Sequence, residues 1–251
     1  MLRAIVRKEG DTIMKRLSTT LFSVSVAAAV VCAAVVPSLA HAAVFPPRSP
    51  QVAFCTPSLG SYFTSVGESI NPAADQLDAQ VWTTSISGNA TFTLMLELAG
   101  NANSNAIGVY NTGGPPVPPL FQVFPGAATA GWYATAHFAG GNLVVSLFDN
   151  NAVYQGNSNY AGVNANGFGF YLQGPGGTFY SQDTRNGGNA QMVTYAGTGV
   201  NFGDWWLCIE DLPYQYPNCL TDYEDAILLL QSVVPTDTKA NTWGRVKAAY
   251  R

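Results

Sequence analysis

The stretch Trp132–Phe148, WYATAHFAGGNLVVSLF, contains two short apolar and aromatic runs separated by Gly140, Gly141 and Asn142. Aromatic and β-branched residues favour strands, and a short Gly/Asn segment between two such runs is a strong signal for a β-hairpin. The stretch therefore predicts strands over residues 132–138 and 143–148 that are joined by a tight turn.

The same pattern of short runs and turn residues repeats along most of the chain. In Ala90–Leu98 polar and apolar residues alternate at first, which places the apolar ones on one face of a strand. Further strands are predicted over residues 105–110, 167–172, 178–182, 191–195 and 204–212. With no long amphipathic helix before the C-terminal tail, this regular series indicates an all-β fold, an antiparallel β-sandwich or jelly roll.

The run Ala226–Val234 is apolar on all sides, so its period does not distinguish a buried strand from a buried helix. We interpret it as a strand because it would pair naturally with residues 204–212.

The first 42 residues have the features of a secretory signal peptide. Lys15 and Arg16 form a basic segment, residues 21–36 are apolar, and residues 40–42 match the small-x-small cleavage pattern. The apolar run is shorter than the about 20 residues that span a membrane, which disfavours an uncleaved anchor. We expect a secreted product without a membrane span, organised as a signal peptide over 1–42, a Pro-rich linker over 43–52, a single β-sandwich domain over 53–236 and a basic, aromatic tail over 237–251.

The charge balance excludes one class of partner. Residues 43–251 contain 13 acidic and 6 basic side chains, a formal net charge of −7. Nucleic-acid binding requires a basic face, which this composition does not provide. Abundant Gly, Asn, Ser, Thr and aromatic residues with few charges are typical of a secreted all-β protein.

Acidic side chains are concentrated at the adjoining ends of two apolar runs. No Lys or Arg lies between Arg185 and Lys239 to neutralise them. Crowded carboxylates repel one another, and an oxygen-rich cluster without His or thiol partners favours a hard cation, above all Ca²⁺. The predicted metal ligands are Glu210, Asp211, Asp222, Glu224 and Asp225.

Three cysteines follow residue 42, namely Cys55, Cys208 and Cys219. An oxidising compartment favours one disulfide with one thiol left over. We favour Cys208–Cys219, because this bridge would close a short ring and hold the carboxylates together. A bridge from Cys55 to either of the other two remains the alternative.

Several segments together carry a family resemblance. They are Leu96–Gly100, Asn105–Tyr110, Asn166–Leu172, Thr178–Gln182, Trp206–Pro213 and Asp222–Asp225. The chain resembles the domain of unknown function 4114 family over about residues 60 to 234. This family occurs in exported and surface-attached bacterial proteins, many of which bear a PEP-CTERM sorting tail. The most specific part is an aromatic strand that ends in Glu-Asp-Leu-Pro, followed by an acidic turn into an apolar strand.

The resemblance implies an extracellular β-sandwich with a Ca²⁺-binding acidic turn and a structural, adhesive or matrix role. The family's Asp-x-Asp-Tyr-Asn-Asp turn matches here only as Thr221–Asp225, with one acidic position lost and Glu224 in place of Asn. Cys219 in this loop implies that a disulfide does part of the holding. The tail shows no sorting motif with an apolar span and basic cluster, which puts anchoring by the PEP-CTERM route in doubt.

The tail contains four of the six basic residues that follow residue 42. A short helix capped near Asn241 would place Trp243 and Tyr250 on one face. The tail resembles the short Trp-Gly-x-x-Lys-x-x-Tyr-Arg endings of some exported bacterial proteins. We expect a helical or extended end that packs on its own domain, or one that docks on a partner through Trp243 and Tyr250.

Catalytic groups are scarce. His137 is the only histidine after residue 42, and its strand position favours a structural role. No nucleophile elbow, phosphate loop or His-rich metal motif is present. We expect no enzymatic activity.

We therefore expect a secreted, calcium-stabilised β-sandwich with a structural or adhesive role at the bacterial cell surface or in extracellular matrix. Its expected partners are surface or matrix components, with self-association as a further expectation. The alternative is a carbohydrate-binding module, because aromatic rings stack on sugars and amides bond their hydroxyls. The candidate glycan-binding residues are Tyr154, Asn159 and Tyr160.

Overall fold

The computed structural model describes residues 48, 58–213 and 222–236. All of the described residues belong to the unit Ala43–Arg251. The predicted signal peptide, the tail and all of the linker except Arg48 lie outside the described residues.

The described residues form one α-helix, 13 strands and three short 3₁₀ turns. The helix α1 spans Ser58–Ser65, and the turns span Ala102–Ser104, Asp183–Asn186 and Gly199–Asn201. The strands are β1 (Val81–Thr84), β2 (Asn89–Glu97), β3 (Ala106–Asn111), β4 (Leu120–Phe124), β5 (Tyr133–Ala139), β6 (Asn142–Phe148), β7 (Tyr154–Ala161), β8 (Phe168–Gly174), β9 (Gly177–Tyr180), β10 (Met192–Ala196), β11 (Trp205–Ile209), β12 (Ala226–Gln231) and β13 (Val233–Thr236).

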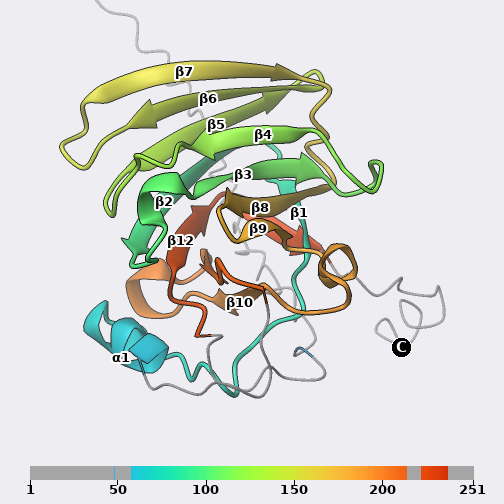
Figure 1. Ribbon diagram of the computed structural model, residues 1–251. Helices are drawn as coiled ribbons and strands as arrows, with labels where there is room; N and C mark the ends of the chain where they lie inside the picture. The colour runs from blue at the N-terminus through green and yellow to red at the C-terminus, as the bar shows by residue number, and fades with distance from the viewer. Residues whose placement is uncertain (1–47, 49–57, 214–221, 237–251) are drawn as a thin grey trace, which may run out of the picture. The chain divides into compact units, whose positions relative to one another are not determined.

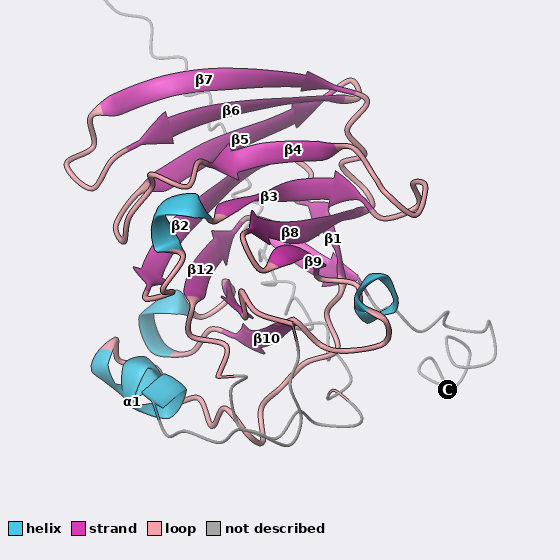
Figure 2. Cartoon of the chain, viewed as in Figure 1, coloured by secondary structure: helices cyan, strands magenta, loops and turns pink. Residues whose placement is uncertain are grey.

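The strands form two antiparallel sheets. The seven-stranded sheet has the order β10-β11-β12-β2-β5-β6-β7, and the six-stranded sheet has the order β13-β1-β8-β3-β4, with β9 also paired to β8. Figure 1 shows the two sheets, and Figure 2 shows that strands dominate the described chain. The predicted all-β antiparallel sandwich is confirmed.

The hairpin predicted from Trp132–Phe148 is present. β5 and β6 pair from end to end, and Ala139 lies opposite Asn142. Gly140 and Gly141 form the two-residue turn with φ of 57° and 79°, a conformation that other residues rarely adopt.

Aromatic and aliphatic side chains from both sheets fill the space between them. Trp82 of β1 and Phe170 of β8 meet edge to face with 5.6 Å between ring centroids, and Phe170 meets Phe92 of β2 at 5.4 Å. All three side chains are at most 1% exposed. Burial of large aromatic surfaces in this arrangement is a main source of stability for the sandwich.

A second apolar layer lies on the other face of the seven-stranded sheet, where α1 covers β10, β11 and β12. Phe63 of the helix packs on Tyr195 and Trp206, with ring centroids 5.2 and 5.6 Å away. The three strands are therefore buried on both faces, which explains why their sequences are continuously apolar. The sequence prediction missed α1, although Leu59, Phe63 and Val66 follow the spacing of a helix face.

Ala226–Val234 is not one strand, as predicted, but parts of two. β12 pairs with β11, as expected, and also with β2, whereas β13 pairs with β1 in the other sheet. The chain changes sheet at Ser232, whose φ is 59°. A single residue in the left-handed region bends the chain sharply, and hydropathy does not reveal such a bend.

Polar side chains fix two of the surface loops. Glu68 accepts hydrogen bonds from the backbone N–H and the hydroxyl of Thr198, at 2.5 Å each, and from Asn201 Nδ2 at 2.6 Å. Burial raises the pKa of Glu68, but these hydrogen bonds outweigh it and hold the pKa below its usual value of 4.5. Arg185 donates to the carbonyls of residues 112 and 114–116 and lies 5.1 Å from the ring centroid of Tyr110.

The sequence did not predict β1, β4 and β7. β4 follows a Pro-rich loop, and β7 is polar on both faces because it forms the edge of its sheet.

None of the helices in the described ranges has the length and apolar character needed to cross a membrane.

Candidate cation site

Three neighbouring strands end at one place and bring acidic side chains together. β11 ends at Ile209, which pairs with Ala226 at the start of β12, so that Glu210 and Asp225 are the next pair in register. On its other side Ala226 pairs with Glu97, at the end of β2. The sheet ladder itself therefore positions these carboxylates.

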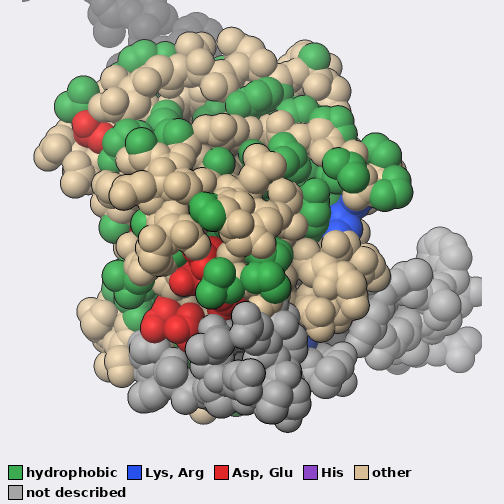
Figure 3. Space-filling view, in the orientation of Figure 1, with side chains coloured by type: hydrophobic (Ala, Val, Ile, Leu, Met, Phe, Trp, Pro, Cys, Tyr) green, Lys and Arg blue, Asp and Glu red, His purple; other side chains and the backbone are tan. Residues whose placement is uncertain are grey.

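The carboxylates of Glu210, Asp211 and Asp225 form one compact group, in which one oxygen from each lies within 4.8 Å of the others. Glu210 is 2% exposed and Asp211 3% exposed, whereas Asp225 and Glu97 are half-buried. Figure 3 shows acidic side chains gathered in the lower half of this face of the molecule. Such a group must be compensated, because burial of unpaired charge is costly.

Backbone amides supply part of the compensation. Asp211 donates its N–H to Asp225 Oδ2 at 2.8 Å. The N–H groups of Leu212 and Asp222 donate to Glu210 at 3.1 Å each. These bonds fix the orientation of the carboxylates but do not neutralise them.

Two asparagines from the turn between β2 and β3 contact the group. Asn105 Nδ2 donates to Asp211 Oδ2 at 2.9 Å, and Asn101 Nδ2 donates to the same oxygen at 3.3 Å. Two buried oxygens beside them, Glu97 Oε1 and Asn105 Oδ1, have no hydrogen-bond partner among the described residues. The site therefore offers oxygen atoms beyond the three central carboxylates.

The electrostatics reflect this crowding. Burial, together with repulsion by Asp211 and Asp225, raises the pKa of Glu97 to about 8, although Asn105 opposes the shift. Burial and the charge of Asp225 raise the pKa of Glu210, whereas burial and the charge of Asp211 raise the pKa of Asp225. Protonation lowers the repulsion between the carboxylates because it removes negative charge, and a bound cation lowers it because it adds positive charge.

The turn before β12 is held by Tyr223, which is fully buried with φ of 58° and donates its hydroxyl to the carbonyl of Ala190 at 2.9 Å. The backbone of Asp222 takes part in the site, but the carboxylates of Asp222 and Glu224 lie outside the central group. Of the five predicted ligands, the structure thus brings three together.

The chemistry of this donor set fits a hard cation. All the ligand atoms are oxygens, and the only ion pair in the described ranges, Arg48–Asp183, is separate from the group. Ca²⁺ takes six to eight oxygen ligands and tolerates irregular geometry. Glu210, Asp211 and Asp225 would hold the ion, and the carboxylate of Glu97 interacts electrostatically with two of them, Asp211 and Asp225.

Sequence reasoning missed Glu97, Asn101 and Asn105. Glu97 lies about 125 residues before the acidic turn, and only the pairing of β2 with β12 brings it close. The available signal was the Asn-rich segment Asn101–Asn105, which follows Glu97 after three residues.

The predicted Cys208–Cys219 disulfide is not seen, because Cys208 is a free thiol. Its side chain is fully buried in the layer beneath α1, among Val193 and Ile227, and burial raises its pKa. The alternative Cys55–Cys208 bridge is excluded in the same way. Cys55 and Cys219 lie outside the described residues, as do Trp243 and Tyr250.

The candidate glycan-binding residues belong to β7 and not to a loop. Tyr154 and Tyr160 lie at opposite ends of the strand, about 20 Å apart at the usual rise per residue. Tyr154 and Asn159 are exposed. The ring of Tyr160 instead packs on Phe121 at 5.6 Å, and its hydroxyl donates to the carbonyl of Gln122 at 2.9 Å.

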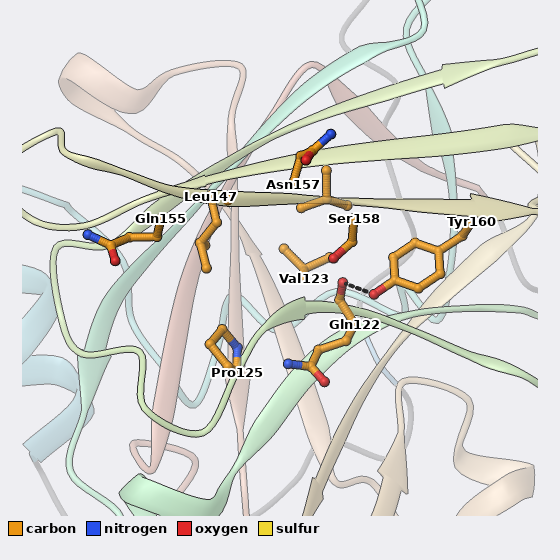
Figure 4. A pocket seen from close by; sticks show the side chains of 10 residues that line it. Gln122, Val123, Pro125, Leu147, Gln155, Asn157, Ser158 and Tyr160 are labelled. Carbon is orange, nitrogen blue, oxygen red and sulfur yellow. Dashed lines mark hydrogen bonds between the residues drawn. The ribbon is translucent and has the colours of Figure 1, made fainter.

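A cavity of about 230 Å³ lies between β4 and β7. Figure 4 shows Ser158 and Tyr160 reaching from β7 toward Gln122 and Val123 of β4, with Asn157 on the other side of the strand. The lining of the cavity includes the side-chain amides of Gln122 and Gln155 and the apolar side chains of Val145 and Leu147.

His137 shares the exposed face of β5 with Thr135, as expected, and its Nδ1 lies 2.7 Å from Asn89 Oδ1. No acidic side chain is among its hydrogen-bond partners in the described residues.

Neither a protein-family model, nor a curated protein, nor a solved structure matches this chain.

Proposed function

We propose that this chain is an exported structural or adhesive β-sandwich that is stabilised by Ca²⁺ at Glu210, Asp211 and Asp225. The observation that carries the proposal is a group of largely buried carboxylates that forms no ion pair with a cationic side chain of the described ranges. The signal-peptide pattern and the resemblance to the domain of unknown function 4114 family support export and a role at the cell surface.

In this role the cation joins the end of β11 to the start of β12. Surface modules commonly use extracellular Ca²⁺ in this way, at affinities in the range of about 10⁻⁴–10⁻³ M. Surface or matrix components are the proposed partners.

Thermal unfolding of the purified chain in excess EDTA and in millimolar Ca²⁺ tests the cation. A ligand that binds only the folded state adds about 1.4 kcal/mol at a tenfold excess over its dissociation constant, which is the excess that about 1 mM Ca²⁺ gives for a dissociation constant of about 10⁻⁴ M. We expect a clear rise in melting temperature that Asp211→Asn removes. Glu224→Gln is the matched control, because it also removes a negative charge but lies outside the central group.

An unchanged melting temperature in Ca²⁺, or a shift that persists in Asp211→Asn, would contradict the proposed site. Cell fractionation and binding to washed cell envelopes test export and adhesion independently, so that either part of the proposal can fail alone.

A carbohydrate-binding function is the second candidate. It is favoured by the cavity between β4 and β7, whose amides and hydroxyls suit sugar hydroxyl groups. A glycan array probed in Ca²⁺ tests it, with Gln155→Ala as the variant expected to lose binding and Thr135→Ala, on exposed β5, as the control. An array without hits would end this candidate.

A further inference from the structure

Charge is distributed very unevenly along this chain. Between Leu98 and Gln182, a segment that contains β3 to β9, Asp149 is the only Asp, Glu, Lys or Arg. In Figure 3 the surface over β4 to β7 consists almost entirely of hydrophobic and uncharged polar atoms. This part of the surface can meet a copy of itself without repulsion, although the chain as a whole is acidic.

The edge strand β7 is the longest exposed element of this region. It has eight residues, none of them charged and none of them proline, and within the described ranges no strand pairs with its outer side. Natural edge strands are usually protected by charges, prolines, bulges or a covering segment.

Two of the other described edges, β10 and β4, do carry such protection. Leu77 covers the outer side of β10 by donating its N–H to the carbonyl of Thr194 at 2.9 Å. β4 follows Pro118 and Pro119, and the hydroxyl of Tyr160 occupies the carbonyl of Gln122 within it.

The register of the β5–β6 hairpin shows which backbone N–H and C=O groups of β7 do not bond to β6. Because β5 and β6 are joined by a two-residue turn, Ala139 and Asn142 form a hydrogen-bonded pair. Hydrogen-bonded and non-hydrogen-bonded pairs alternate along an antiparallel ladder. The N–H and C=O of Leu143 are therefore directed to β7, where Leu143 pairs with Tyr160. The groups directed away from β6 are therefore those of Asn157, Asn159 and Ala161.

A bulge limits the part of β7 that can accept a further strand. Leu147 pairs with Gly156 but Phe148 pairs with Tyr154, which leaves Gln155 as the extra residue. Bulges disturb the regular edge, so the segment Gly156–Ala161 is the part available for pairing.

We propose that Gly156–Ala161 pairs antiparallel with the same segment of a second copy and joins the two seven-stranded sheets across a twofold axis. The outward N–H and C=O groups belong to every second residue of β7. In an antiparallel register, residues 157, 159 and 161 of one copy can therefore lie opposite the same three residues of the other. No charged side chain lies in the segment to oppose this homotypic contact. A pair of edge strands is a small interface, so the association is weak and depends on concentration.

The inference supplies a surface for the self-association expected of a matrix protein, but it does not depend on the cation site. β7 lies at the opposite edge of the seven-stranded sheet from β10, and β2, β5 and β6 separate it from β12. Association measured in Ca²⁺ and in EDTA therefore separates the two proposals.

Sedimentation velocity of the purified chain over a hundredfold range of concentration tests the contact. We expect the wild type to form dimers, and Asn159→Pro to stay monomeric because proline removes an outward N–H that β6 does not use. Asn159→Thr keeps the N–H and is the matched control that should still associate. Thermal unfolding of each variant verifies that it folds.

A charge-swap experiment identifies the partner. Asn159→Lys alone and Asn159→Asp alone should each be monomeric, because the two copies bring like charges together. An equimolar mixture of the two should associate at least as well as the wild type. A wild type that is monomeric at every concentration, dimers that survive Asn159→Pro, or a mixture that does not associate would overturn the proposal.

Discussion

Replacement of Asp225 by Asn should stabilise the protein when no cation is present. Asp225 Oδ2 accepts the N–H of Asp211 at 2.8 Å, and its carboxylate also faces Glu210. An asparagine keeps the first contact through its carbonyl oxygen and offers Glu210 an N–H in place of a second negative charge. The substitution thus keeps a hydrogen bond between the two side chains, without loss of shape, but no longer requires the pair to hold a proton to avoid repulsion.

The magnitude follows from the geometry. Two unit charges at the 4.8 Å limit of this group repel by about 3.5 kcal/mol in a medium of effective dielectric constant 20. A shared proton and the half-exposed position of Asp225 reduce this value, so we expect a gain of about 1–3 kcal/mol. For a domain of this size that gain raises the melting temperature by about 2–10 °C.

The assay is thermal unfolding in excess EDTA, repeated in millimolar Ca²⁺. Asp225→Asn should unfold above the wild type in EDTA and should lose most of the Ca²⁺ shift, so the substitution acts with opposite signs in the two buffers. Glu224→Gln controls for net charge and should change stability by less than about 0.5 kcal/mol. A lower melting temperature for Asp225→Asn in EDTA would refute the electrostatic reasoning, and an equal rise in Glu224→Gln would assign the effect to net charge.

Three further predictions concern the scaffold. Phe63→Ala should cost about 3–5 kcal/mol in urea unfolding, because a fully buried ring is lost, and it should make Cys208 reactive toward an aromatic disulfide reagent. The lowered pKa of Glu68 gives a stability contribution that is complete above 4.5 and is lost as pH falls through the lowered value; Glu68→Gln should flatten this part of the acid-unfolding curve. Arg185→Lys should cost about 1–3 kcal/mol and open the loop 112–116 to proteolysis, because an ammonium group cannot reach the same carbonyls or stack on a ring; unchanged cleavage would contradict the anchoring role.

The sequence predicted those elements whose local signal agrees with their place in the fold. The hairpin around Gly140 and Gly141 is an example, because the turn residues and both strands carry their own signals. The strands β11 and β12 were found as apolar runs, but their lack of alternation reflects a second layer beneath α1. Ser232 could not be found in this way, since its role as the bend between two sheets depends on tertiary pairing.

The candidate site shows the same division. Glu210, Asp211 and Asp225 were predicted because they flank two apolar runs that pair as neighbours. Glu97 was missed because its position depends on the register between β2 and β12, which no local pattern encodes. The buried Cys208 illustrates the reverse error, in which nearness in sequence to Cys219 suggested a bond, whereas Cys208 is a free thiol.

The place of β12 in the sheet constrains the order in which this chain folds. β12 comes near the C-terminal end of the described residues, yet it lies between β11 and β2 in the middle of the seven-stranded sheet. A chain that emerges N-terminus first cannot complete this sheet until residues 226–231 have been synthesised. One of the two strands that pair with β2, namely β12, lies about 130 residues downstream of it. Such distant pairing slows folding and keeps the sheet open during synthesis. Asp225 directly precedes β12, so the proposed cation site would form only when β12 has inserted between β11 and β2.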